Sequence, residues 1–358
     1  MALWLPLFEG EIALPTLFAP RDWHAHEMLF GYVPAVVTGF LLTAIPNWTG
    51  RLPLQGLPLL FLVIVWMAGR IAVSCSAHLG WLLTAMIDCV FLVLVVGAAA
   101  REIVAGQNWR NLKVVIPVTM LALANAGFHI EAHVSGAAQF ALRTGVIAIL
   151  ILVMLIGGRI IPSFTHNWLV RENPGRLPLP FGKFDMAAIA LSAAALCLWV
   201  AAPDGLLIGA VLCIAAVLHV VRLARWAGER TARERLVLVL HVAYAFVPLG
   251  FALTGLAAFG LVLPSAGLHA WMAGAVGTMT LAVMTRASLG HTGQELVAGI
   301  GTQTIYAAVV LAALARVGAA LDPAWAVSLI HVAAFAWVVA FGGFALLYAP
   351  ILFHARAN

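Results

Sequence analysis

The sequence predicts an all-α fold, a polytopic bundle of transmembrane helices, from its composition, its hydropathy and the placement of its charges. Of the 358 residues, 64% are hydrophobic and only 9% are charged. The mean hydropathy is +1.05. Soluble domains keep about a quarter of their residues charged. This composition therefore excludes a soluble, a disordered or a secreted disulfide-rich protein.

Apolar segments long enough to cross a bilayer follow one another along the whole chain. A transmembrane helix needs about 20 apolar residues, and each such run between charged residues, prolines or glycines predicts one span. The first half of the chain contains predicted spans at 27–46, 57–76, 79–100, 112–133 and 139–161. The second half contains predicted spans at 184–202, 205–224, 236–262, 267–286, 295–316 and 324–349. About 11 spans are expected in total.

The segments between these spans are too short for a soluble domain. Residues 1–358 are therefore expected to form a single transmembrane domain. Residues 1–26 are predicted to be an N-terminal segment at the outer face. The longest connector, 162–183, contains Pro174, Pro178 and Pro180 and is predicted to be a cytoplasmic loop.

Basic residues orient the predicted bundle. With alternate loops on opposite sides, one side receives Arg51, Arg101, Arg110, Lys113, Arg159, Arg171, Arg176, Lys183, Arg222, Arg225, Arg230, Arg233, Arg235, Arg286 and Arg356. The other side receives Arg21, Arg143 and Arg316. The basic side is predicted to be cytoplasmic. The net charge of +5 is then explained by loops that face anionic lipid, and no nucleic acid partner is expected.

This orientation places the N-terminus outside. Residues 1–20 lack the basic region of a signal peptide, and a chain without a signal peptide normally starts inside. We therefore expect a further helix before Met1, which makes twelve.

Histidines are unusually frequent for so apolar a chain, with twelve in total. Those in the predicted outer half are His24, His26, His78, His129, His133, His269 and His331, and those in the inner half are His219 and His241. Polar side chains inside a membrane are costly and usually functional. The outer histidines are therefore expected to bind a metal or haem.

Spacing restricts which histidines can act together. His129 and His133 are four residues apart, so both project from one helical face and can serve one site. His24 and His26 cannot share a face of a regular helix, so either one lies on an irregular entry or they serve different centres. The alternative for each is an interfacial histidine bonded to its neighbours.

The residue types narrow the possible cofactors. Neutral imidazole suits haem iron, copper and zinc alike. The sequence has no CxxCH motif and no clustered cysteines, which excludes c-type haem and an iron–sulfur centre. The four cysteines lie in apolar stretches and are expected to be packing residues.

Charged residues inside or beside the spans are the candidate proton carriers. Arg70 and Asp88 lie on neighbouring spans and can pair, either as a structural ion pair or as part of a proton path. Arg70 can alternatively hold a haem propionate. Glu27 and Glu131 lie beside outer histidines, where each can orient an imidazole, relay protons or face water.

Four ordered segments of the sequence resemble the NnrS family. They are the run from Trp23-His24-Ala25-His26-Glu27-Met28 to Arg51, GRIIPSFTHNW (158–168), HVAYAFVPLG (241–250) and LHA…GTMTLAVMTRASLGHTG (268–293). The histidines in these segments are His24, His26, His166, His241, His269 and His291.

The resemblance implies a bacterial inner-membrane protein of about twelve helices that contains haem and copper. It also implies a role in nitric oxide stress and denitrification. Family members usually carry a further hydrophobic segment before the Trp-His-Ala-His motif, which agrees with the expected additional helix.

We therefore expect b-type haem and copper at a centre ligated by some of His24, His26, His129, His133, His269 and His331. Asp88, Glu27 and Glu131 are the expected proton carriers, and Arg70 is the expected cofactor contact. His219 and His241 either hold a second haem or bridge helices.

The leading hypothesis is an oxidoreductase that converts nitric oxide to nitrous oxide, with an electron donor that no motif identifies. One alternative is a non-enzymatic protein that binds nitric oxide or metal and protects against nitrosative stress. Another is a haem or copper transporter, against which the sequence shows no internal repeat and no paired broken helices.

Overall fold

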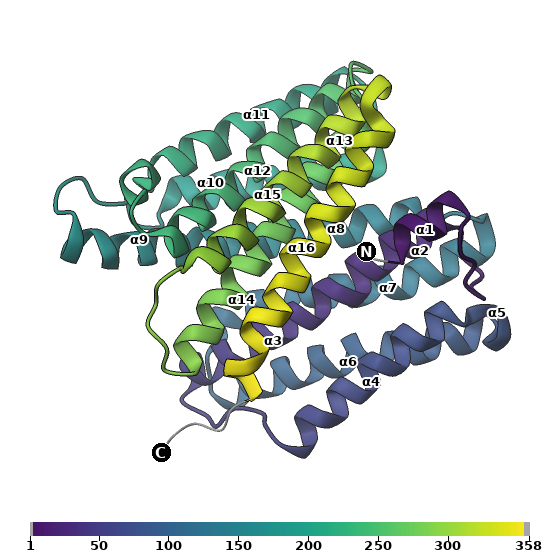
Figure 1. Cartoon of the computed structure of the whole chain (residues 1–358), viewed down its shortest axis with the longest axis horizontal. Coiled ribbons are helices and arrows are strands. Elements are labelled where there is room, and N and C mark those ends of the chain that lie inside the picture. Colours follow the sequence, from purple (N-terminus) through teal and green to yellow (C-terminus); the bar gives the residue numbers. More distant parts are fainter. Residues whose placement is uncertain (1–2, 354–358) are drawn as a thin grey trace. The chain divides into compact units, whose positions relative to one another are not determined.

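The structure is a computed structural model that describes residues 3–353. Within that part of the chain, helices alternate with short connections and no β-strand occurs (Figure 1). Eleven helices are long and apolar enough to cross a membrane, and each lies at one of the predicted spans. The predicted polytopic helical bundle is therefore confirmed. The predicted cytoplasmic Arg356 and the helix expected before Met1 lie outside the described residues.

The helix contacts divide the chain into two compact units, and the N-terminal unit ends at Leu152. Its elements are α1 (Trp4–Glu9), α2 (Pro20–His26), η1 (Glu27–Tyr32), α3 (Val33–Thr49), α4 (Leu57–Ser74), α5 (Ser76–Leu79), α6 (Trp81–Ala105), η2 (Trp109–Val114), α7 (Val115–Ser135) and α8 (Gln139–Leu152). Within this unit α4 packs against α6, α6 against α7, and α7 against α8 (Figure 1).

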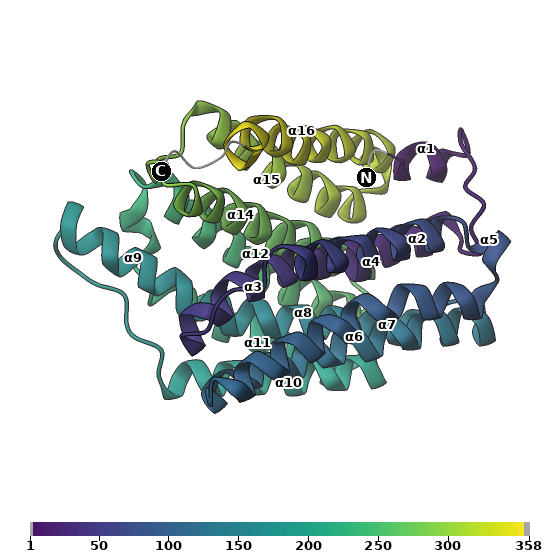
Figure 2. The ribbon, with the colours of Figure 1, turned by 90° about the horizontal axis from the view of Figure 1, so that it is seen from below.

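The C-terminal unit begins at Val153. Its elements are η3 (Val153–Gly157), α9 (Gly158–Glu172), α10 (Lys183–Ala201), α11 (Leu206–Ala224), η4 (Gly228–Thr231), α12 (Arg235–Ala258), α13 (Pro264–His269), η5 (Ala270–Gly277), α14 (Thr278–His291), α15 (Ile300–Leu321), η6 (Pro323–Trp325) and α16 (Ala326–Phe353). Within it α11 packs against α12, and α15 lies beside α16 (Figure 2).

Prolines and glycines set several helix ends. Pro20 and Pro264 occupy the first turns of α2 and α13, where the missing backbone N–H has no intrahelical partner to lose. Helix α3 is followed by Gly50 at φ +69°, and α7 by Gly136 at φ +75°. This left-handed backbone conformation favours glycine and stops a helix.

Three of the membrane-spanning helices in the described part of the chain contain a π-helical segment. These three helices are regularly spaced, with three other spans between each one and the next. They are the first, fifth and ninth spans, Pro20–Thr49, Gln139–Glu172 and Pro264–His291, with η1, η3 and η5 inside them. The sequence did not reveal this recurrence, because a π turn has no hydropathy signature. This recurrence concerns helix geometry, and the expectation that the sequence contains no internal repeat stays a prediction. Short π segments inside α-helices often mark functional sites.

These three spans also extend beyond their predicted ends. The helix predicted to stop at residue 161 continues to Glu172, so the predicted loop 162–183 is a connection only from 173 to 182. The predicted N-terminal segment 1–26 likewise contains α2, which places His24 and His26 inside the first helix. An apolar segment of the sequence ends at the first polar residues. An α-helix can continue through polar residues until its backbone hydrogen bonding stops.

Candidate metal centre

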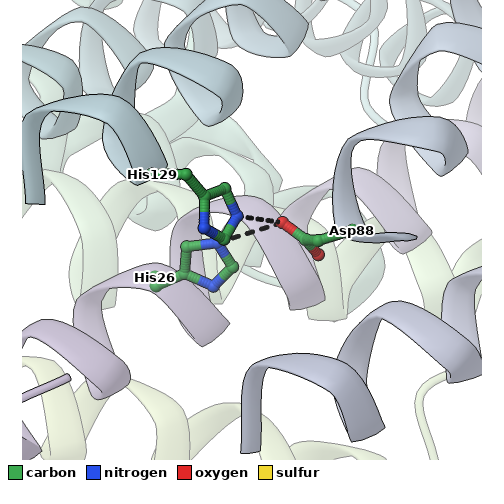
Figure 3. Close-up of side chains that lie close together, drawn as sticks. All are labelled: His26, Asp88 and His129. Carbon is green, nitrogen blue, oxygen red and sulfur yellow. Dashed lines mark hydrogen bonds and ion pairs between the residues drawn. The ribbon is translucent and has the colours of Figure 1, made fainter. Parts of the chain in front are cut away.

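Three predicted site residues meet in the N-terminal unit: His26, Asp88 and His129. Nε2 of His129 lies 3.0 Å from Oδ2 of Asp88, and Nε2 of His26 lies 3.2 Å from the same oxygen (Figure 3). One potential ligand atom of each residue lies within 4.8 Å of the other two. We call these three residues the His26–Asp88–His129 cluster.

Three helices deliver the cluster to the interior of the unit. His26 is the last residue of α2, directly before the π segment η1, while Asp88 and His129 lie on α6 and α7. The exposed fractions of His26, Asp88 and His129 are 0%, 1% and 2%. Polar groups buried this deeply need partners, because bulk solvent does not reach them. The cluster residues provide those partners for one another.

Asn125 joins the cluster, and the sequence analysis did not identify it. Its Nδ2 donates a hydrogen bond to Oδ2 of Asp88 at 2.9 Å, and its Oδ1 lies 3.1 Å from Nε2 of His26. Asn125 lies one helical turn before His129 on α7, so both project from one face. That spacing inside an apolar span was the signal that could have revealed it.

Glu27 and Arg70 complete the charged surroundings. Arg70 Nη1 donates to Oε1 of Glu27 at 2.6 Å, and Arg70 Nη2 pairs with Asp88 Oδ1. Oε1 of Glu27 also lies 3.4 Å from Nδ1 of His26. The predicted pairing of Arg70 with Asp88 is therefore confirmed. Because Arg70 offsets only one of two carboxylates, neutral imidazoles leave one net negative charge at this site.

The donor set fits a metal ion. Two atoms bound to one metal at about 2.0–2.1 Å in a tetrahedron lie about 3.3 Å apart, close to the 3.0 and 3.2 Å between the imidazole nitrogens and Asp88. In the part of the chain that the structure describes, the buried Nδ1 of His129 has no hydrogen-bond partner. Two imidazoles and one carboxylate suit zinc, copper or iron.

Two glycines make room for the charged groups around the cluster. A Cβ atom at Gly31 would collide with Nη1 of Arg70, and one at Gly69 would lie 3.0 Å from Oδ1 of Asp88. Gly31 belongs to the π segment η1, and its carbonyl accepts a hydrogen bond from Trp66 Nε1 at 2.9 Å. The close approach of Arg70 to the first span therefore depends on glycine.

The Gly31→Ala substitution is expected to destabilise the protein by about 1–3 kcal/mol, because overpacking pushes Arg70 away from its carboxylate partners. The matched control is Gly39→Ala in the same span, where an added Cβ meets nothing within 4 Å. Thermal unfolding in detergent measures both. Equal melting temperatures for the two variants would contradict the steric argument.

Three other predicted residues of this unit have partners outside the cluster. The ring of His24 lies 4.5 Å from that of Trp4, and the ring of His133 stacks on Trp81 at 4.2 Å. Glu131 accepts hydrogen bonds from the backbone N–H groups of Phe140 and Ala141 at the start of α8. The structure thus gives His133 a different neighbour from His129, despite their spacing of one turn.

In the C-terminal unit, His269 and His331 share one local arrangement. Nδ1 of His269 donates to the carbonyl of Ser265 at 2.6 Å, and Nδ1 of His331 donates to that of Val327 at 2.9 Å. Because Nδ1 carries the proton in both residues, the lone pair of each neutral imidazole lies on Nε2. Nε2 of His269 accepts a hydrogen bond from Arg316 Nη2 at 2.6 Å.

His219 and His241 instead bridge helices of the C-terminal unit. Nδ1 of His219 lies 2.9 Å from Tyr244 Oη and its Nε2 lies 3.0 Å from Ser192 Oγ. Nε2 of His241 lies 2.8 Å from Thr165 Oγ1. Of the two alternatives for this pair, the geometry favours helix bridging over a second haem.

An arginine contacts each of the three π-containing spans at its π segment. Arg70 bonds to Glu27, the first residue of η1. Arg222 Nη1 donates to the carbonyl of Met154 in η3 at 3.1 Å. Arg316 bonds to His269, directly before η5. A π turn interrupts the regular helical bonding pattern. Of the three arginines, Arg222 donates to a backbone carbonyl of its π segment, whereas Arg70 and Arg316 bond to side chains.

The whole chain resembles one known family. A family model described as NnrS protein matches residues 1–356. No curated protein and no solved structure matches the chain. The sequence segments that resemble this family include His26 and His269 but not Asp88 or His129.

Proposed function

Because the chain belongs to the NnrS family, we propose that it is a nitric oxide detoxifying protein of the bacterial cytoplasmic membrane. The observation that supports this function best is the buried His26–Asp88–His129 cluster. A metal held there would lie in an apolar interior, where nitric oxide, a small uncharged molecule, dissolves readily.

Copper is the metal we propose for this cluster. The net charge left by Glu27, Asp88 and Arg70 is neutralised by one monovalent cation, either a proton on His26 or Cu⁺. Imidazole suits copper, and the carboxylate supplies the third donor. Metal binding would displace the protons shared among His26, His129 and Asp88, so copper and protons compete for one site.

The proposed reaction joins two nitric oxide molecules: 2 NO, 2 electrons and 2 protons yield N₂O and H₂O. Copper and haem b, when bound, supply the one-electron chemistry. Glu27 is the proposed proton carrier, since its side chain is 19% exposed while His26 is fully buried. Arg70 holds that carboxylate 3.4 Å from His26 Nδ1 and so orients it for proton transfer.

His269 and His331 are the proposed ligands of haem b in the C-terminal unit. Their Nδ1–H groups donate to carbonyls of their own helices, which is the orientation typical of metal-ligating histidines. Arg316 donates to Nε2 of His269 at 2.6 Å and would have to release that nitrogen when haem binds. It is then the proposed partner of a haem propionate, because guanidinium binds carboxylates in a forked geometry.

Loss of either proposed haem ligand is expected to lower the haem content and to change the reduced optical spectrum. The variants are His269→Ala and His331→Ala, and the control is His166→Ala on the exposed part of α9. Haem per protein is measured as the pyridine complex, and spectra are recorded before and after dithionite and nitric oxide. Unchanged haem content in both ligand variants would refute this assignment.

The copper assignment is tested by a pair of histidines on one helix. His129→Gln is expected to lose bound copper, because it removes a donor from the cluster. His133→Gln, one turn further along α7 and stacked on Trp81, is expected to retain it. Copper is counted per purified protein after reconstitution with Cu⁺. Equal copper content in the two variants would exclude this cluster as the site.

Turnover is tested with a nitric oxide electrode, using reconstituted protein and a chemical electron donor. Continuous consumption with matching production of nitrous oxide supports the reductase. Uptake that stops at one or two nitric oxide molecules per protein refutes turnover and identifies the non-enzymatic buffer. His129→Gln should abolish continuous consumption, whereas His133→Gln should not.

A further inference from the structure

A second buried polar network lies in the C-terminal unit, and the proposed reaction does not use it. Arg222 forms an ion pair with Asp185, Nε to Oδ1, at 2.8 Å, and its Nη1 donates to Tyr244 Oη at 2.6 Å. Tyr244 contacts His219, which contacts Ser192, at 2.9 and 3.0 Å. Arg222, Tyr244, His219 and Ser192 are each 0% exposed.

One arrangement of protons gives each hydrogen of the Tyr244 phenol and the His219 imidazole a partner. Arg222 can only donate, so the phenol oxygen of Tyr244 accepts from it. The single phenol proton then points to Nδ1 of His219, which accepts it. The neutral imidazole consequently carries its own proton on Nε2, where it donates to Ser192. Tyr244 is thus a phenol whose oxygen lies 2.9 Å from an imidazole nitrogen that can accept its proton.

Two other tyrosines of the chain have hydroxyl partners. The hydroxyl of Tyr306 bonds to that of Thr285, and the hydroxyl of Tyr348 lies 2.8 Å from that of Thr302. A threonine hydroxyl is a poor proton acceptor, whereas imidazole is a good one. Oxidation of a phenol at ordinary potentials requires that its proton leave with the electron. Tyr244 therefore has a proton acceptor that the hydroxyl partners of Tyr306 and Tyr348 do not provide.

Aromatic rings surround the phenol and the imidazole. Trp226 meets the ring of Tyr244 at 4.6 Å, and Phe251 stacks on His219 at 5.4 Å with 8° between the planes. These walls exclude water and fix both rings. Asp185 lies 2.8 Å from Arg222 and 3.9 Å from Arg225, and a proton that moves to His219 adds one positive charge to this network.

We propose that Tyr244 and His219 form a one-electron redox site that reduces the nitrogen dioxide radical to nitrite. The radical takes one electron from the phenol. The O–H bond of Tyr244 breaks, and an N–H bond forms at Nδ1 of His219. The products are nitrite, a tyrosyl radical and an imidazolium. This proposal rests on the proposed function only for its oxidant. Nitrogen dioxide forms when nitric oxide reacts with oxygen in a membrane.

The test uses the full-length protein in lipid nanodiscs, with nitrogen dioxide generated by pulse radiolysis of nitrite. Electron paramagnetic resonance on rapidly frozen samples detects the tyrosyl radical. The wild type and Tyr306→Phe are expected to give the signal. Tyr244→Phe and His219→Gln are expected to lose it, the latter because glutamine cannot take up the proton. Formation of the radical is also expected to be slower in D₂O.

A second readout needs no variant. A tyrosyl radical that captures another nitrogen dioxide molecule becomes 3-nitrotyrosine, and mass spectrometry locates it. Nitration is expected at Tyr244 in preference to Tyr306 and Tyr348. A radical that persists in Tyr244→Phe, or nitration spread evenly over the tyrosines, would overturn the proposal. Copper content and nitric oxide consumption, tested through His129, remain separate from this result because Tyr244→Phe leaves that cluster intact.

Discussion

Asp88→Asn is expected to abolish copper binding at the His26–Asp88–His129 cluster and to destabilise the N-terminal unit by about 3–5 kcal/mol. The carboxylate of Asp88 meets Arg70, Asn125 and both histidines. An asparagine in its place turns an N–H₂ group toward donors and removes one of the two carboxylate charges beside Arg70. No water is available there to replace the lost bonds.

Copper content and thermal unfolding of the purified variant test this expectation. The matched control is Asp185→Asn, which neutralises an equally buried carboxylate, 1% exposed and paired with Arg222. It should also lower the melting temperature, but it should leave the copper content unchanged. Retention of copper by Asp88→Asn, or equal copper loss in both variants, would remove Asp88 from the ligand set.

Arg222→Met is expected to destabilise the C-terminal unit by about 3–5 kcal/mol, because it leaves the buried charge of Asp185 without its main partner. Arg222 also packs closely against Gly158, where an added Cβ atom would collide with Nη2 of the arginine. Its guanidinium lies 5.2 Å from the ring of Trp226. The side chain therefore combines an ion pair, hydrogen bonds and aromatic packing.

A double-mutant cycle separates the ion pair from the packing. Arg222→Met, Asp185→Asn and the double variant are compared by thermal or chemical unfolding in detergent. If the pair dominates, the double variant is more stable than the sum of the single effects predicts, with a coupling energy of about 1–3 kcal/mol. Additive effects would show that aromatic packing, and not the ion pair, accounts for the loss.

The recurrence of π segments links these two predictions. Arg70 and Arg222, the partners of Asp88 and Asp185, each lie against a π-containing span. In both places a glycine, Gly31 or Gly158, provides the space for the guanidinium. The same arrangement therefore occurs twice in the chain. It consists of a π segment, a glycine within or directly after that segment, and an arginine that pairs with a buried aspartate.

Local properties of the sequence determined where the membrane-spanning helices lie along the chain. All eleven spans could be placed from hydropathy, because the free energy of transferring a segment into a bilayer is a sum over its own residues. The pairing of Arg70 with Asp88 was also predictable, since the tight turn between their spans makes the two helices neighbours. Helix ends were less predictable, as the continuation to Glu172 shows.

The tertiary structure decided which histidines act together. Spacing along α7 suggested that His129 and His133 share a site, yet His129 meets Asp88 while His133 stacks on Trp81. His26 and Asn125 lie 99 positions apart and meet because α2 and α7 turn these faces to each other. The packing of several helices at once determines which helix faces meet. The hydropathy and periodicity of a single segment do not contain that information.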